Sequence, residues 1–201
     1  MSKVSVIIPY YEADPDKPAV LKRLTDSLVG ADEIIVVWND KMGYAKPINK
    51  GLNIAHGDFL MVLNDDLKMD PGGDLHNLCD PNFVTSPTVD GNEQPFWGCA
   101  FMMPRWVFEQ TGGLDERYRI SYFDDDDFIN ELRKNDIPMK CMPFVNFWNV
   151  DGGGRTLHTF PDHNEFFEEN KQRFIEKWGG TPDQITAFYE QHGRLPEKNE
   201  L

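Results

Sequence analysis

The first third of the chain alternates short apolar runs with segments in which apolar residues recur at helical spacing. The apolar runs Val4–Ile8, Glu33–Trp38 and Phe59–Leu63 have the length of buried strands. The helix-patterned segments 18–28 and 48–55 lie between them, and Gly57 can close the second as a left-handed cap. Strands joined through helices pair in parallel by right-handed crossovers, so their carboxyl ends lie at one edge of a sheet. This order predicts an α/β fold.

Polar residues follow each of these three strands. They are Pro9-Tyr-Tyr-Glu12, Asn39-Asp40 and Asn64-Asp65-Asp66. Ligands of open parallel sheets bind beyond the carboxyl ends of the strands. The side-chain oxygens of Asn64 to Asp66 suit a hard cation such as Mg²⁺ or Mn²⁺, and phosphate oxygens would complete the coordination shell of that cation. A simple polar turn is the alternative, because Asn and Asp also favour turns.

A second acidic group, Asp124 to Asp127, stands between Tyr122-Phe123 and Phe128-Ile129. Carboxylates in such a place can cap a helix, because the positive end of the helix dipole stabilises negative charge. Four in succession also repel one another, and this repulsion raises the pKa of a carboxylate and makes it a useful general base. We expect this quartet and the Asn64 to Asp66 triplet to form two walls of one active site.

The rest of the chain predicts strands at 82–86, 96–103 and 140–147, and helices at 104–110, 125–135 and 164–178. From about Pro182 onward we expect a weakly packed tail. Gly152-Gly-Gly154-Arg155 can cradle a diphosphate or act as a lid over it, with a flexible loop as the alternative. His158 follows this loop and is a candidate metal ligand, or else a surface histidine.

Composition bounds the protein class. The chain has 201 residues, enough for one domain, and a net charge of −14, which opposes attraction to nucleic acid or anionic lipid. Cys79, Cys99 and Cys141 lack CxxC spacing, so we expect free thiols in a reducing compartment. The sequence shows no leader and no apolar span of the roughly 20 residues that a membrane helix needs, so we expect a cytoplasmic protein.

Several motifs together resemble the nucleotide-sugar glycosyltransferases of the type A fold, above all glycosyltransferase family 2 and its rhamnosyltransferase-like branch. The resemblance spans about residues 3 to 179. In the first half of the chain it rests on Val4-Ser-Val-Ile-Ile-Pro-Tyr-Tyr11, on Gly43-Tyr-Ala45 with Asn49, Gly51 and Ala55, and on Leu63-Asn-Asp-Asp66. In the second half it rests on Gly98, Gly112-Gly-Leu-Asp-Glu116, Tyr122-Phe-Asp-Asp-Asp-Asp127 and Lys177-Trp-Gly179. Leu63 to Asp66 stands where that family has its Asp-x-Asp metal motif, and Tyr122 to Asp127 where it has Glu-Asp-x-Asp.

The resemblance implies a single-domain type A glycosyltransferase fold, with a Rossmann-like, mostly parallel central sheet flanked by helices. It also implies a nucleotide-binding half at about residues 1–70 and an acceptor half at 71–179, with residues 180–201 left as the tail. The implied reaction moves a sugar from a nucleoside-diphosphate sugar, expected to be a UDP-sugar, to an acceptor hydroxyl of a glycan, lipid, protein or modified nucleobase. Inversion is expected, although Trp38-Asn39-Asp40 is more like exostosin-type transferases, many of which retain configuration.

The resemblance further implies a role for each matched position. Asp125 would be the base that deprotonates the acceptor, Asp127 would help to hold it, and Mn²⁺ or Mg²⁺ would be bound by Asp66, with His158 as a further ligand. The expected nucleotide-binding residues are Pro9, Tyr11, Glu12, Asn39, Lys46, Asn64 and Asp65. The expected acceptor-binding residues are Trp97, Gly98 and Asp124.

Two other classes of function fit the acidic segments. One is a non-catalytic module that binds calcium or carbohydrate. The other is a metal-dependent nucleotidyltransferase on a similar sheet, which would release diphosphate from a nucleoside triphosphate.

Overall fold

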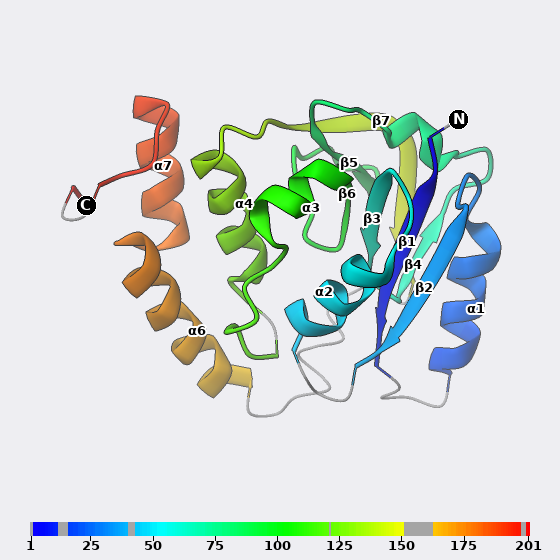
Figure 1. Cartoon of the computed structure of the whole chain (residues 1–201). Helices are drawn as coiled ribbons and strands as arrows, with labels where there is room; N and C mark the ends of the chain where they lie inside the picture. The colour runs from blue at the N-terminus through cyan, green and yellow to red at the C-terminus, as the bar shows by residue number, and fades with distance from the viewer. Residues whose placement is uncertain (1, 12–15, 40–42, 121, 151–162, 198–199) are drawn as a thin grey trace.

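The protein folds around one curled, seven-stranded sheet with helices on both faces (Figure 1). The computed structural model describes residues 2–11, 16–39, 43–120, 122–150, 163–197 and 200–201. The strands are β1 Val4–Tyr10, β2 Glu33–Trp38, β3 Phe59–Leu63, β4 Leu67–Met69, β5 Val84–Val89, β6 Ala100–Pro104 and β7 Met139–Asn149. The helices are α1 Lys17–Ser27, α2 Ala45–Ile54, α3 Arg105–Thr111, α4 Asp124–Lys134, α6 His163–Trp178 and α7 Pro182–His192, with a short 3₁₀ helix, η1, at Leu75–Leu78.

The first three strands pair as the sequence predicts. Strand β1 lies between β2 and β3 and is parallel to both, with Ile7 opposite Ile35 on one side and Val62 on the other. Every residue of β1 and β3 is buried, which is why both strands read as continuous apolar runs rather than as alternating ones. The carboxyl ends of β1, β2 and β3 therefore share one edge of the sheet.

The second half of the sheet is mixed rather than parallel. The strand order is β2-β1-β3-β6-β5-β7-β4, and the pairs β3 with β6, β6 with β5, and β7 with β4 are antiparallel. The physical reason is chain length, because only residues 90–99 join β5 to β6 and a parallel crossover needs a dozen or more. The α/β fold is confirmed, but its parallel character is limited to β1, β2, β3 and the β5–β7 pair.

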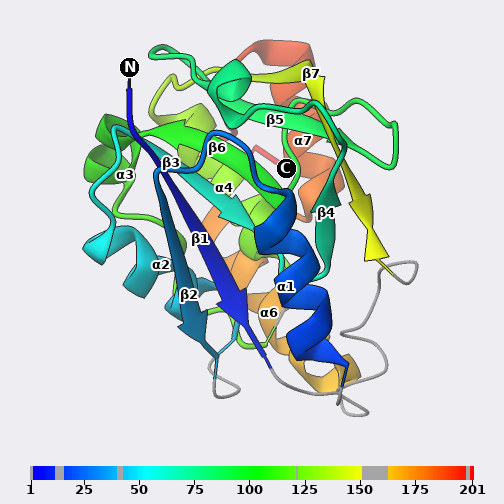
Figure 2. The same ribbon diagram turned by 90° about the vertical axis from the view of Figure 1, so that its right-hand side faces the viewer.

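Helices cover the two faces of the sheet with two separate apolar clusters. On one face, α1 and η1 pack through residues such as Leu24 and Leu75. On the other face, α2, α3 and α4 pack through residues such as Ile48, Val107 and Phe128 (Figures 1 and 2). In the described part of the chain, no helix combines the length and the apolar character needed to cross a membrane. The three cysteines are free thiols, as expected.

A third apolar cluster attaches the C-terminal helices to the segment before α4. It consists of Tyr118, Phe123, Phe174 and Ile185, all buried. Residues 182–192, which the sequence assigns to a weakly packed tail, form the helix α7. The Thr181 side chain accepts a hydrogen bond from the backbone N–H of Gln184, whose own side chain accepts one from Thr181. This reciprocal cap starts the helix.

The sequence hides α7 because the helix buries so little of itself. Ile185 is its only fully buried residue, so the helix shows no apolar stripe of the usual width. The signals that do exist are local ones: Thr181 with Gln184 three residues later, Pro182 in the first turn and Gly193 at the left-handed C-cap.

Removal of the Ile185 side chain tests whether α7 is a packed helix. Ile185→Ala is expected to lower the free energy of unfolding by about 2–4 kcal/mol, because it leaves a cavity in the third cluster. Chemical denaturation measures this change. The exposed Gln191→Ala in the same helix is the control, with an expected change of less than about 0.5 kcal/mol. Equal effects of the two substitutions would mean that α7 does not depend on this contact.

Candidate active site

The turn between β3 and β4 places three polar residues at the carboxyl edge of the sheet. Asn64 continues the pairing of β3, since its N–H donates to the carbonyl oxygen of Cys99 at 2.9 Å. Asp65 and Asp66 follow, with only 8% and 9% of their surfaces exposed. The turn is short because β4 begins at Leu67. All of β3 is buried, as are Leu67 and Met69 of β4, and these residues hold the acidic side chains below the surface.

Asp65 is held by groups from the first βα connection. Its carboxylate accepts hydrogen bonds from the Lys17 ammonium group and from the backbone N–H of Tyr11, the latter at 3.3 Å. The Lys17 side chain is buried, with 7% exposed, at the first residue of α1. Lys17 is not predicted from the sequence, because a single lysine before a proline carries no motif. Its ammonium group supplies a buried positive charge beside the acidic turn.

Tyr44 connects this turn to the second half of the chain. Its hydroxyl oxygen lies 2.8 Å from Asn64 Oδ1 and 2.7 Å from the carbonyl oxygen of Gly98, so one phenolic proton is shared between two acceptors. Burial raises the pKa of Tyr44 well above its usual value, and the negative charges of Asp124, Asp125 and Asp66 add to that rise. Tyr44 therefore remains a neutral donor.

The acidic quartet opens α4, and its four side chains differ in exposure. Tyr122 and Phe123 both have positive φ values, 79° and 68°, and this left-handed turn starts the helix abruptly. Asp124 and Asp127 turn inward and are buried, whereas Asp125 is exposed. Burial, followed by the charge of Asp125, raises the pKa of Asp124 far above that of a free carboxyl group. The crowding of like charges in the sequence predicts a raised pKa in this quartet, and in the structure burial is the larger cause.

Gly98 lies against the exposed member of the quartet. A Cβ atom at this position would lie 2.8 Å from Asp125 Cβ and 3.0 Å from Asp125 Oδ2, so there is no room for a side chain. Cys99, the next residue, has its pKa raised to about 12, first by burial and then by the nearby charge of Asp66, with a smaller contribution from Asp125. The structure thus brings both Asp66 and Asp125 near Tyr44 and Cys99.

Asp127 has a different environment from Asp125. It is 1% exposed, and its carboxylate accepts hydrogen bonds from the Tyr118 hydroxyl at 3.0 Å, the Trp178 indole N–H at 2.7 Å and Lys177 Nζ at 2.9 Å. Burial raises the pKa of Asp127, and the bonds from Lys177 and Trp178 oppose that rise. These partners occupy both oxygens. The arrangement fits the attachment of α4 to α6 better than the predicted contact with an acceptor.

The remaining predicted residues lie around the same edge with varied exposure. Pro9 is a buried part of β1, and the Asn39 side-chain amide donates to the carbonyl oxygen of Gly43 at 3.0 Å. Lys46 is exposed in the first turn of α2. Trp97 is half-buried, and its backbone N–H donates to Ser86 Oγ. Glu12, His158 and the Gly152 to Arg155 loop lie outside the described residues.

The acidic turn offers the chemistry of a site for Mg²⁺ or Mn²⁺. Its donors are carboxylate oxygens, and these cations are usually held by one or two carboxylates together with phosphate oxygens. Among the described residues no three acidic, histidine or cysteine side chains come together as a metal cage. Asp66 therefore fits a cation whose shell a bound ligand completes, because Asp65 already binds Lys17.

Comparison with known proteins shows a likeness of structure. No family model and no curated protein matches this chain. A crystal structure of GalNAc-T7 with UDP, GalNAc and Mn²⁺ matches with a TM-score of 0.65 and 12% identity, over 97% of this chain and 56% of that one. The catalytic domain of Drosophila β1,4-galactosyltransferase 7 in complex with xylobiose matches with a TM-score of 0.50 and 19% identity, over 76% and 68%.

A third solved structure, a mutant of the Drosophila enzyme in complex with manganese, UDP-Gal and xylobiose, matches with a TM-score of 0.51 and 18% identity over the same shares of the two chains. Identities this low show the fold alone. The type A glycosyltransferase fold is thereby confirmed, and this chain spans little more than half the length of GalNAc-T7.

The crowding at the start of α4 predicts a pH-dependent effect of Asp126→Asn. Burial and the charge of Asp125 raise the pKa of Asp126 to about 6, so the folded state favours the protonated form. Stability from this group is complete below the pKa of the unfolded chain and is lost as pH rises through about 6. The variant should therefore gain about 1 kcal/mol relative to wild type between pH 5 and pH 8. Denaturation at both pH values measures this gain, and a constant difference would contradict it.

Proposed function

We propose that this chain is a metal-dependent glycosyltransferase that moves a sugar from a UDP-sugar to an acceptor hydroxyl. The observation that carries the proposal is that Asp66 and Asp125, far apart in sequence, both lie near Tyr44 and Cys99, with Asp125 against Gly98. The fold supports it, since solved structures with the same fold contain UDP, a sugar and Mn²⁺. The closer kinship with the rhamnosyltransferase-like branch of family 2 rests on the sequence motifs.

Asp125 is the proposed general base. It is the exposed member of the quartet, and Gly98 on one side and the start of α4 on the other restrict its position. Asp125 Oδ1 accepts a hydrogen bond from the backbone N–H of Asp126 at 3.0 Å, which orients the carboxylate. From this place Asp125 would remove the proton of the acceptor hydroxyl as the hydroxyl attacks the anomeric carbon, with inversion of configuration.

Asp66 is the proposed metal ligand. A bound Mn²⁺ or Mg²⁺ would offset the negative charge of the diphosphate leaving group. The protein's own part is to hold the Asp66 carboxylate at the end of β3 and to place Lys17 beside Asp65. Pro9, Tyr11 and Asn39 lie at the ends of β1 and β2, on the same edge, and are proposed to line the nucleoside site.

We propose that Trp97 and Gly98 line the acceptor side of the site, where Gly98 lies against Asp125. Asp124 is buried beside Tyr44, and Asp127 is bound to Lys177 and Trp178. Both are proposed to position α4 rather than to contact the acceptor directly. Because these residues set the direction in which Asp125 points, their contribution to turnover would act through Asp125.

Removal of the base is the first test of this function. Asp125→Asn is expected to leave the Kd for UDP within about twofold of wild type and to lower turnover by two or more orders of magnitude. Calorimetry and a UDP-release assay measure the two quantities. Asp26→Asn, in an exposed ion pair with Lys22, is the control and should keep full turnover. If Asp125→Asn turned over donor and acceptor at the wild-type rate, Asp125 would not be the base.

Metal dependence is the second test. Wild-type protein should bind UDP more tightly with Mn²⁺ than with a chelator, by roughly tenfold or more, and Asp66→Ala should abolish that difference. A thermal-shift screen of nucleoside diphosphates, with and without Mn²⁺, identifies the donor base, because binding raises the apparent stability. The same affinity for UDP with and without metal in the wild-type protein would contradict the assignment of Asp66.

A further inference from the structure

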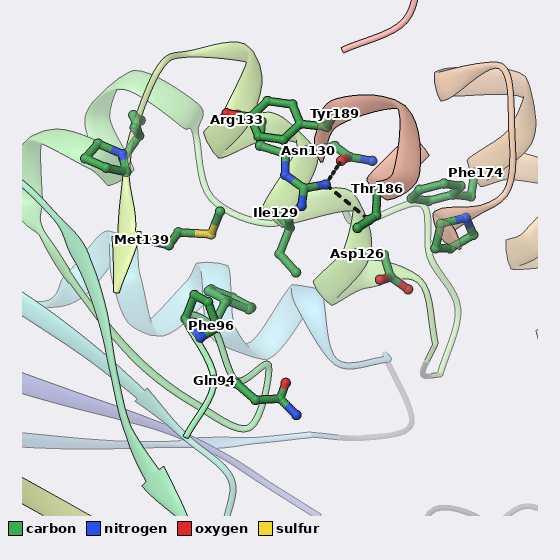
Figure 3. A pocket seen from close by; sticks show the side chains of 14 residues that line it. Gln94, Phe96, Asp126, Ile129, Asn130, Arg133, Met139, Phe174, Thr186 and Tyr189 are labelled. Carbon is green, nitrogen blue, oxygen red and sulfur yellow. Dashed lines mark hydrogen bonds between the residues drawn. The ribbon is translucent and has the colours of Figure 1, made fainter. Parts of the chain in front are cut away.

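A cavity of about 480 Å³ lies between α4, α7 and the segment that precedes Trp97 (Figure 3). We call it the α4–α7 pocket. Its volume is that of a small-molecule site. Residues from five parts of the chain line it: the segment 94–96, the α4 residues from Asp126 to Arg133 that face the cavity, the segment 137–139, Phe174 on α6, and Pro182, Thr186 and Tyr189 on α7. None of the residues proposed to bind the donor nucleotide contributes to its wall.

Arg133 provides a polar group in the pocket wall that the described residues do not satisfy. Its guanidinium group donates to Asn130 Oδ1 at 3.2 Å and to Thr186 Oγ1 at 3.3 Å, and it stacks over the ring of Tyr189 at 4.5 Å. These contacts fix its orientation (Figure 3). The Nε–H of Arg133 is buried and meets no acceptor among the described residues. A buried donor without an acceptor costs free energy.

Asp126 gives the pocket a charge of the opposite sign. It lies two helical turns before Arg133 on α4, at the end of the cavity nearest the start of that helix (Figure 3). The other walls mix amides and a hydroxyl with apolar surface, namely Gln94, Asn130, Thr186, Phe96, Ile129 and Met139. The pocket therefore presents hydrogen-bond donors, acceptors and apolar faces in one small volume.

This mixture selects among ligand classes. An anion would pair with the Arg133 guanidinium group but be repelled by the Asp126 carboxylate, and a cation would meet the reverse, so a net charge of either sign gains little in this pocket. A purely apolar ligand would offer no partner to the Asp126 carboxylate or to the Nε–H of Arg133. An uncharged ring with several hydroxyl groups satisfies donor and acceptor together, and its C–H face can lie on Phe96 or Tyr189. That description is of a sugar ring.

The pocket also adjoins the proposed site of transfer. Asp126 follows Asp125 directly, and the segment Gln94 to Phe96 continues into Trp97 and Gly98, which contacts Asp125. We propose that the α4–α7 pocket binds an uncharged sugar ring of a glycan acceptor, next to the sugar whose hydroxyl faces Asp125. This inference rests on the proposed function, and it names the acceptor class as an oligosaccharide rather than a single sugar.

Direct binding of uncharged sugars to the full chain tests the inference. The probes are lactose, cellobiose and methyl β-galactoside, with glucuronate as the anionic comparison, followed by saturation-transfer NMR and titration. At least one of the disaccharides is expected to bind, and Arg133→Met and the milder Thr186→Val should each weaken it, the former by roughly tenfold. Arg119→Met is the matched control, because Arg119 also stacks over an aromatic ring, that of Phe166, but lies outside the pocket.

The outcomes separate this inference from the proposed function. UDP affinity in the presence of Mn²⁺ is measured on the same samples and should be unchanged in all three variants. Absence of UDP binding to wild-type protein would count against the glycosyltransferase itself. With UDP bound normally, three results would overturn the inference: no disaccharide binding up to about 10 mM, binding that neither Arg133→Met nor Thr186→Val weakens, or tighter binding of glucuronate than of the uncharged sugars.

Discussion

The hydroxyl group of Tyr44 joins the two halves of this molecule at the point where the candidate chemistry lies. It reaches Asn64 at the end of β3 and the carbonyl oxygen of Gly98, two positions that are 34 residues apart in sequence and belong to different halves of the sheet. Asp66 follows Asn64 by two residues, and Asp125 lies against Gly98. Because Tyr44 is half-buried and lies near several negative charges, its hydroxyl keeps its proton and the contact persists as a neutral hydrogen bond.

A second, partly buried contact holds one carboxylate of the quartet inward. Lys177 forms ion pairs with Asp115, Asp127 and Glu131, so α6 holds the first turns of α4 from one side. Burial of Lys177 opposes its charge, yet the hydrogen bonds to Asp127 and Glu131 outweigh burial and raise its pKa. Since Asp127 is fixed inward by this pairing, helix geometry turns Asp125 outward, toward Gly98.

The elements whose apolar pattern depends on burial alone could be predicted from the sequence. The runs at β1, β2 and β3 and the acidic turn after β3 were predictable, because a parallel strand order fixes which ends meet. Four features could not be predicted in this way: the position of β6, the helix α7, and the roles of Tyr44 and Lys17. Each depends on a tertiary contact: a short connection that forces antiparallel pairing, one buried isoleucine, a shared phenolic proton and a single buried ion pair.

The same distinction explains why the quartet was only partly understood from the sequence. Four adjacent aspartates have one composition but four environments, and only the structure separates Asp125 near Gly98 from Asp126 in the α4–α7 pocket and from the inward pair. Like charges this close cannot all ionise without cost, so a fold that keeps them must disperse them into different surroundings. Here α6 neutralises Asp127, burial raises the pKa of Asp124, and two neighbouring carboxylates remain to face two different surfaces.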